Sequence, residues 1–187
     1  MDQPNVCRCG WCNLTNQAYI DYHDREWGIP TRDDHALFEL LLLENFQAGL
    51  SWECVLNKRE SFRQAFDRFD LDRVCGYGEA DVQRLLSNPG IIRNQLKIRA
   101  AITNARVFRA IGLEYGSFSS YIWHFTKGRI LYETGKSSSG LSDQVSGELR
   151  KRGMKFVGTT IVYSYLQAIG VINSHEERCF LYRSGRQ

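Results

Sequence analysis

The chain has 187 residues, 43% of them hydrophobic and 12% aromatic, which excludes the intrinsically disordered class and allows a core of its own. Its 24 Lys and Arg residues against 21 Asp and Glu residues give a formal net charge of +3, too small a bias to indicate nucleic acid by itself. No basic segment followed by an apolar one opens the chain, and the longest apolar run, residues 40–43, is too short to cross a bilayer. We expect a cytoplasmic protein whose six cysteines are reduced thiols.

Helical periodicity begins near the N-terminus. Five residues follow the i, i+3, i+4, i+7, i+8 pattern: Tyr19, Tyr22, His23, Glu26 and Trp27. This spacing predicts a helix with one largely aromatic face that also carries a histidine.

A buried helix is predicted next. Thr31 or Asp33 can cap it, and the leucine-rich run that follows extends it to Glu44. Glu44 lies seven residues after Leu37 and three after Leu41, so its carboxylate projects from the apolar side of this helix. A carboxylate there needs partners, unless the helix ends one residue earlier and the side chain turns to solvent or caps a neighbouring helix.

The residues after Glu44 supply the parts of a small pocket. Gln47 adds an amide, Trp52 a stacking surface, and Gly49 a point at which a backbone or a ligand can approach closely. Together they could form a pocket for a nucleobase. Aromatic side chains more often build the core, and that interpretation stays open for most of the 10 Phe, 9 Tyr and 4 Trp of the chain.

The remaining segments predict further helices and loops. We expect helices over 51–58, 61–66, 79–87, 91–111, 117–125, 141–151 and 159–169, and a loop over 126–140. An Asn-Pro-Gly turn at 88–90 joins two of these helices into a helix-hairpin-helix pattern over 79–111. No convincing pair of strands is found. The fold is therefore predicted to be all-α, with residues 1–187 in one domain.

Basic residues follow the predicted hairpin. Residues 93–113 contain five basic side chains and no acidic one: Arg93, Lys97, Arg99, Arg106 and Arg109. A Pro-Gly turn whose free backbone N–H groups begin a helix, flanked by such cations, indicates a phosphate-binding end, and a duplex backbone is its natural ligand. A second basic cluster supports this: Arg150, Lys151, Arg152 and Lys155. The alternative is a solvated helical face after a turn that only reverses the chain.

Two potential metal ligands lie near each end of the chain, Cys9 and His23 at the front, His175 and Cys179 at the back. On a helix, the i, i+4 spacing of the rear pair places both side chains on one face, so four ligands suited to zinc could tie the two ends together. Each residue alone is more often a core histidine or an inert thiol. Cys12 could also replace His23, because Cys9-x-x-Cys12 has the spacing of structural zinc sites.

These residues belong to longer motifs spread over nearly the entire chain: Arg8-Cys9-Gly10-Trp11, Tyr22-His23-Asp24-x-Glu26-Trp27-Gly28, Glu44-x-x-Gln47-Ala48-Gly49-Leu50-Ser51-Trp52, Gly90-Ile91-Ile92-Arg93, Lys155-Phe156-Val157-Gly158-Thr159-Thr160 and Asn173-x-His175-x-x-x-Cys179. In these motifs the chain resembles the DNA-3-methyladenine glycosylase I family. The resemblance implies a helix-hairpin-helix enzyme that excises 3-methyladenine from alkylated double-stranded DNA in base excision repair. It also implies that residues 1–28 and 170–187 form a unit holding a structural zinc, and it favours His23 over Cys12 as a ligand.

The resemblance assigns roles around the base. It implies that Glu44 and Tyr22 hydrogen-bond the excised base and that Trp52, Trp27 and Trp11 surround it. Glu44 and Tyr22 are therefore the expected catalytic residues.

Further residues are expected at the DNA. The resemblance implies that Gly49 and Leu50 form a wedge that fills the gap in the duplex. We assign backbone contacts at the hairpin to Gly90, Ile91, Arg93 and Lys97. The chain departs from the family pattern in two places. Phe46 stands where a polar residue is expected and could alter the wedge, and Cys7 and Cys12 flank the first ligand.

The expected mechanism is base flipping followed by hydrolysis with water, with no cofactor consumed. No Asp occurs between Asp81 and Asp143, which fits the resembled family and argues against a bifunctional glycosylase/lyase. Only Cys179 lies near the C-terminus, too few thiolates for a four-cysteine iron–sulfur cluster. Two alternatives stay open: a zinc-stapled DNA-binding module without catalysis, and a glycosylase of the same fold with another alkylpurine preference. We expect a monomer on DNA and no membrane association.

Overall fold

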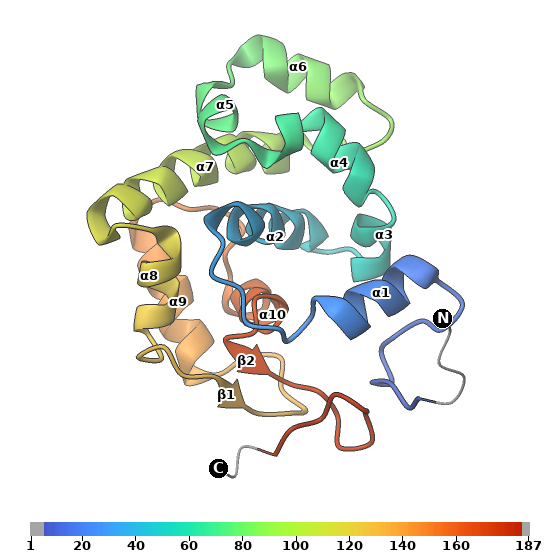
Figure 1. Ribbon diagram of the computed structural model, residues 1–187. Coiled ribbons are helices and arrows are strands. Elements are labelled where there is room, and N and C mark those ends of the chain that lie inside the picture. The colour runs from blue at the N-terminus through green and yellow to red at the C-terminus, as the bar shows by residue number, and fades with distance from the viewer. Residues whose placement is uncertain (1–5, 185–187) are drawn as a thin grey trace.

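Helix α2 (Asp34–Gln47) runs through the middle of the computed structural model, which describes residues 6–184 (Figure 1). Helices α3, α7, α8 and α10 pack around it. The other elements, in chain order, are α1 (Gln17–Arg25), α3 (Trp52–Leu56), α4 (Arg59–Ala65), the 3-10 turn η1 (Asp67–Phe69), α5 (Leu71–Gly76), α6 (Glu79–Ser87), α7 (Gln95–Tyr115), α8 (Phe118–His124), β1 (Leu131–Tyr132), α9 (Gly140–Lys151), α10 (Thr159–Ala168) and β2 (Ile172–Asn173). The mostly helical structure fits the all-α prediction.

Helix α2 forms where the sequence predicts a buried helix, but it continues to Gln47, beyond the expected end at Glu44. The side chain of Asp33, rather than that of Thr31, caps it by accepting a hydrogen bond from the backbone N–H of Ala36. Every residue from Leu37 to Phe46 is buried, including two glutamates. A helix buried on all sides is the element against which the other layers are assembled.

The hairpin between α6 and α7 begins its second helix later than expected. We predicted a helix from residue 91, but α7 starts at Gln95, because the side chain of Asn94 caps it by accepting from the N–H of Lys97. The side chain of Ile91 is buried in the turn instead. Gly116, with φ of 83°, ends α7 in the left-handed conformation.

Three local features were not predicted. The sequence indicated neither α5 nor the turn at residues 67–69, where Asp67, Arg68 and Phe69 all adopt positive φ values. The expectation that no strands pair was also wrong, because Leu131 and Tyr132 pair in parallel with Ile172 and Asn173. Two-residue strands carry no alternating pattern, so the sequence could not reveal a contact across some forty positions.

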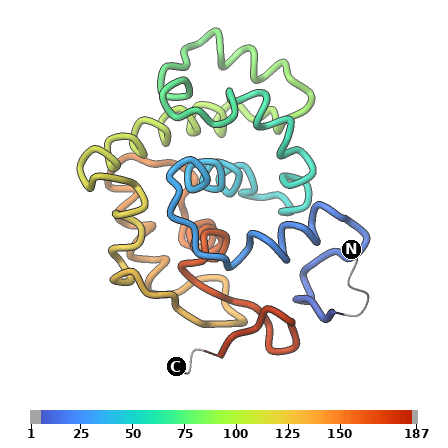
Figure 2. The backbone as a smooth tube through the Cα atoms, in the orientation of Figure 1, coloured from blue at the N-terminus to red at the C-terminus, as the bar shows by residue number. Residues whose placement is uncertain are grey.

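The two ends of the described chain lie side by side, as the tube in Figure 2 shows. The backbone N–H of Phe180 donates to the carbonyl of Cys7, and Gly28 and Thr31 donate to carbonyls at the end of α10. The predicted terminal unit of residues 1–28 and 170–187 includes residues 1–5 and 185–187, which lie outside the described residues. Within residues 6–184, no helix is long and apolar enough to cross a membrane.

Candidate active site and metal centre

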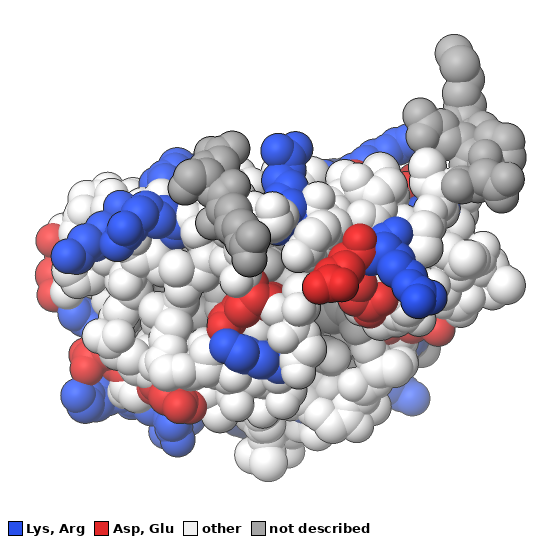
Figure 3. All heavy atoms as spheres, turned by 90° about the horizontal axis from the view of Figure 1, so that it is seen from below, with Lys and Arg blue, Asp and Glu red and all other residues white. Residues whose placement is uncertain are grey.

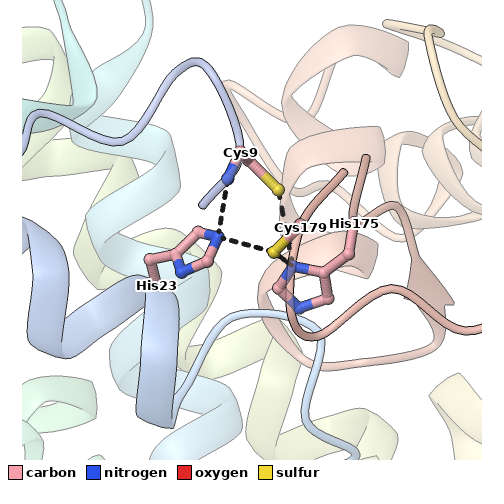
Figure 4. A group of neighbouring side chains, drawn as sticks. All are labelled: Cys9, His23, His175 and Cys179. Atoms are coloured by element: carbon pink, nitrogen blue, oxygen red, sulfur yellow. Dashed lines mark hydrogen bonds between the residues drawn. The ribbon is translucent and has the colours of Figure 1, made fainter. Parts of the chain in front are cut away.

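Four side chains from the two ends of the chain meet in one buried cluster (Figure 4). The ligand atoms of Cys9, His23, His175 and Cys179 all lie within 4.8 Å of one another. The Sγ of Cys179 is 3.5 Å from His23 Nε2 and 3.5 Å from His175 Nδ1, and the Sγ of Cys9 is 3.5 Å from His175 Nδ1. In a zinc tetrahedron with ordinary Zn–S and Zn–N bonds, neighbouring S and N atoms are about 3.5 Å apart. The cluster could hold a metal ion.

An acidic group orients one imidazole of this cluster. Asp24 lies 2.7 Å from His23 Nδ1, and Arg8 holds the same carboxylate through its Nε and Nη2 atoms. The Nε2 atom of His23 is thereby directed at Cys179 Sγ and also accepts from the backbone N–H of Cys9. Burial lowers the pKa of both histidines, that of His175 to about 4, so both rings are in the neutral form that binds metals.

The rear ligands do not lie on a helix, contrary to our interpretation of their spacing. Residues 176–179 form a turn, in which the N–H of Cys179 donates to the carbonyl of Glu176. This tight turn brings His175 and Cys179 together as one helical turn would have done. Cys12 lies outside the cluster, and its Sγ contacts the carbonyl of Tyr19.

A cavity of about 110 Å³ lies next to this cluster of cysteines and histidines, because Trp11 and Trp27 of its wall contact the rings of His23 and His175. All five residues expected around a base line it, together with four others: Trp11, Tyr22, Trp27, Glu44 and Trp52, with Tyr19, Gln47, Ser164 and Gln167. The rings of Tyr22 and Trp52 are 5.1 Å apart, and those of Trp11 and Trp27 are 4.8 Å apart. Ser164 and Gln167 come from α10, far along the chain, and no signal in the sequence indicated them.

Three polar atoms in the wall of this cavity are buried and have no hydrogen-bond partner among the described residues: Glu44 Oε2, Gln47 Oε1 and Trp52 Nε1. Buried polar groups are nearly always paired, so each exception needs an explanation. Two acceptors and one donor on the wall of an aromatic cavity match a ligand that is flat and carries polar edges.

Burial of Glu44 changes its acidity. Glu44 is 3% exposed, no cation within residues 6–184 lies beside its carboxyl group, and burial raises its pKa to about 8. Burial also raises the pKa of Tyr22 well above its usual value. The cavity therefore carries no net charge near neutral pH. A carboxyl group kept neutral by an apolar pocket is the kind of perturbed group that clusters at functional sites.

Gly49 and Leu50 lie at the end of α2, just after Gln47 of the cavity wall. Gly49 has φ of 79°, and the N–H of Leu50 donates to the carbonyl of Gln47 in a tight turn. The side chain of Leu50 is 43% exposed. Phe46 points the other way, fully buried against Phe62, so it forms part of the core.

The hairpin residues differ in how much they offer to a ligand. Arg93 is exposed, and the structure shows no hydrogen bond or ion pair for it within residues 6–184. The other four basic residues of the run 93–113 lie on α7, and all have partners. Arg99 and Arg109 form salt bridges with Glu79 and Asp72. Arg106 donates to the carbonyls of Cys75 and Tyr77, and Lys97 donates to those of Phe46 and Ala48. The N–H of Gly90 is also occupied, by Asn88 Oδ1. The hairpin therefore has fewer unpaired donors available for a phosphate group than the sequence indicated.

One face of the molecule carries both signs of charge. Figure 3 shows the side seen from below in Figure 1, where basic and acidic side chains are interspersed among uncharged ones. This face offers no uniformly positive surface for a phosphate backbone.

Comparison with known proteins gives consistent matches. A family model described as methyladenine glycosylase matches residues 11–182. The chain is 45% identical over 182 residues to DNA-3-methyladenine glycosylase 1 of Escherichia coli (strain K12), covering 94% of this chain and 96% of that protein.

Solved structures agree with this match. A crystal structure of 3-methyladenine DNA glycosylase I superposes with a TM-score of 0.90 at 44% identity, over 95% of this chain and 100% of that one. A variant of a 3-methyladenine DNA glycosylase I in complex with 3-methyladenine superposes with a TM-score of 0.88 at 32% identity, over 92% of this chain and 95% of that one.

Proposed function

Because this chain belongs to the methyladenine glycosylase family, we propose that it hydrolyses the N-glycosidic bond of 3-methyladenine in alkylated double-stranded DNA. One observation carries the proposal: Glu44 is buried in an aromatic cavity, and its Oε2 atom has no partner among residues 6–184. A relative 32% identical to this chain is known in complex with the same base, which supports the choice of ligand.

Recognition begins with a nucleotide that leaves the base stack and enters the cavity. Extrusion costs a few kcal/mol and is easiest for damaged bases. Glu44 and Gln47 accept hydrogen bonds from the base, Trp52 Nε1 donates one, the Tyr22 hydroxyl forms a further hydrogen bond, and the rings of Trp27 and Trp11 surround the base. A positively charged alkylpurine lowers the pKa of Glu44 by its own field, so the carboxylate forms when the lesion is bound.

Chemistry then needs little acid catalysis, since an alkylated cationic purine is already a good leaving group. The bond between the sugar carbon and the base nitrogen breaks, and its electron pair neutralises the purine. Water adds to the oxocarbenium-like sugar and loses a proton, which gives an abasic site and free 3-methyladenine. The ionised Glu44 stabilises the developing positive charge. No Asp lies between Asp81 and Asp143, in keeping with a monofunctional enzyme.

DNA binding is assigned to the side of the molecule where the α6–α7 turn and the end of α2 lie (Figure 1). We propose that residues 79–115 act as a helix-hairpin-helix, in which the turn with Gly90, Ile91 and the exposed Arg93 approaches the phosphate backbone. Gly49 and Leu50 fill the gap left by the extruded nucleotide. The enzyme acts as a monomer.

The metal of the terminal cluster is proposed to be zinc. Two thiols and two neutral imidazoles, with S to N separations of 3.5 Å, suit its tetrahedral coordination. Four protein ligands leave no open position, so the ion would stabilise the joined chain ends and take no part in hydrolysis. Metal analysis of the purified protein should give one zinc per chain.

Replacement of Glu44 tests the proposal. Glu44→Gln keeps the volume but removes the carboxylate, and we expect release of 3-methyladenine from alkylated DNA to fall by about 100-fold in single-turnover experiments. The matched control is Glu60→Gln, the same chemical change at an exposed position on α4, which should release the base at the native rate.

The other outcomes distinguish the alternatives. Native release by Glu44→Gln removes Glu44 from the mechanism. No release by the native protein, with DNA binding intact, favours a zinc-stapled binding module without catalysis. Faster release of another alkylated purine in a profile of several lesions assigns the fold to a different substrate.

A further inference from the structure

Lys97 is the one basic residue of α7 whose side chain is almost fully buried, with 7% of its surface exposed. Its Nζ lies 2.7 Å from the carbonyl oxygen of Phe46 and 2.5 Å from that of Ala48. Within residues 6–184 it forms no ion pair with a carboxylate. Its other neighbour is the ring of Phe156, whose centroid is 6.0 Å from the Nζ. A buried ammonium group with only backbone carbonyls as hydrogen-bond partners is costly, which points to a role at those carbonyls.

These two carbonyls belong to the end of α2. The last carbonyls of a helix lack partners within it, and a cation placed there also interacts favourably with the helix dipole. The last turn of α2 contains no basic residue of its own. Lys97 supplies that cation from another helix. It is the C-terminal cap of α2, provided by the first turn of α7.

The capped end of α2 carries much of the proposed chemistry. Glu44 and Gln47 line the base cavity, and Leu50 projects from the turn that follows. Lys97 lies three residues after Asn94, at which the hairpin turn gives way to α7. Another lysine also contacts the hairpin turn, although from the start of α4: Lys58 Nζ is 3.5 Å from the carbonyl of Pro89 and 3.4 Å from that of Gly90.

We propose that Lys97 is a positioning residue for excision: it fixes the loop of residues 47–51 relative to the hairpin, so that a duplex seated on the hairpin presents its lesion to a preformed wedge and pocket. The inference rests on the proposed glycosylase function and replaces our expectation that Lys97 contacts phosphate. Displacement of such a loop by about 1 Å is enough to lower a reaction rate by one to two orders of magnitude.

The test separates positioning from phosphate binding. Lys97→Met keeps an unbranched side chain without the charge. We expect its single-turnover excision rate to fall at least about tenfold, while affinity for undamaged duplex changes by less than about twofold. The slope of log affinity against log salt concentration should stay at the native value, because no phosphate contact is lost. In Arg93→Gln, which removes an exposed cation, the slope should become shallower by about one.

A double-mutant cycle examines the route of the effect. In a Leu50→Ala background, Lys97→Met should slow excision much less than in the native protein, because the loop that it positions has lost its wedge. Equal fold-losses in both backgrounds would overturn the inference. So would a shallower salt slope in Lys97→Met with an unchanged excision rate.

A measurement on the native protein applies even when Lys97→Met does not fold. Reductive methylation followed by peptide mapping should leave Lys97 unmodified both with and without duplex DNA, since its Nζ is already bonded inside the protein. Modification of Lys97 in free protein and its protection by DNA would identify a phosphate contact and overturn the inference. Absence of base release by native protein would overturn the proposed function instead.

Discussion

Two glutamates on α2 are both buried, and their different surroundings give them different acidities. Glu39 contacts Arg59 and Arg63, and although burial acts to raise its pKa, these cations hold it below the ordinary value. Glu44 has no cation nearby, and burial raises its pKa to about 8. A structural carboxylate is paired, as Glu39 is. A buried carboxyl group without a partner, such as Glu44, lowers the stability of the fold, and binding of a ligand is the better explanation of its presence.

The unpaired state of Glu44 predicts a pH-dependent stability. Its folded pKa of about 8 lies above the unfolded value near 4.5, so the native state binds the proton more tightly, and stability falls as pH rises through this window. The loss should approach about 1.4 kcal/mol per pH unit. Urea unfolding of the native protein and of Glu44→Gln between pH 5 and pH 8 should show the native protein losing stability relative to the variant. Parallel curves would mean that Glu44 is already paired or exposed in solution.

At the level of residues, spacing along the chain indicated Glu44 as a carboxylate on an apolar helix face and proposed the four residues that meet in the cluster, but only the resemblance to a known family favoured His23 over Cys12. These predictions succeeded because each depends on a few residues of distinctive chemistry: a carboxylate within an apolar helix, and thiol and imidazole groups near the two ends of the sequence. Lys97 shows the limit, because a basic residue in a basic run can point to either side of its helix. The partnerless state of Gln47 and Trp52 could not be predicted either, since it depends on which side chains from distant elements surround them.

At the level of elements, long periodic segments were predicted well, and short ones poorly. Helices α6 and α9 have apolar faces, and α2 has a continuous apolar run after its cap Asp33, all of which the sequence displays. The turn at 67–69 and the strands β1 and β2 depend on contacts made elsewhere, so local propensity does not indicate them. His175 and Cys179 were predicted to be neighbours on one helical turn. They are neighbours, but a non-helical turn brings them together.

Gly170 joins two elements by close packing. It follows α10 with φ of 72°, and an added Cβ would lie 2.4 Å from the backbone of Ile29 and Pro30. Gly170→Ala should therefore separate the segment after α1 from α10 and lower the free energy of unfolding by about 3 kcal/mol. Thermal or urea unfolding measures the loss.

The matched control for that substitution is Gly147→Ala. Gly147 lies inside α9, and nothing within 4 Å would meet its added Cβ. The free energy of unfolding should rise by up to about 1 kcal/mol, because alanine favours helix. An unchanged unfolding midpoint in Gly170→Ala would show that the backbone of residues 29 and 30 can move away from the added Cβ without loss of stability.

At the level of the whole molecule, the cluster of Cys9, His23, His175 and Cys179 joins the two ends of the chain. The front pair meets the rear pair across more than 150 positions, so a metal bound there would hold the ends together and would couple its binding to folding. Chelation of the metal should lower the melting temperature on the order of 10 °C. Cys179→Ser should melt at the chelated temperature and show no further change with chelator. A melting temperature that changes neither with chelator nor with Cys179→Ser would contradict the joining of the chain ends by a metal.

The meeting of the chain ends also has a consequence for biosynthesis. Translation delivers Cys9 and His23 more than 150 positions before His175 and Cys179. Throughout elongation the front of the protein, including Trp11 and Trp27 of the cavity wall, lacks the segment against which it docks. A ribosome-stalled nascent polypeptide that ends before residue 175 should consequently neither retain zinc nor bind the free base, however well its central helices have already assembled.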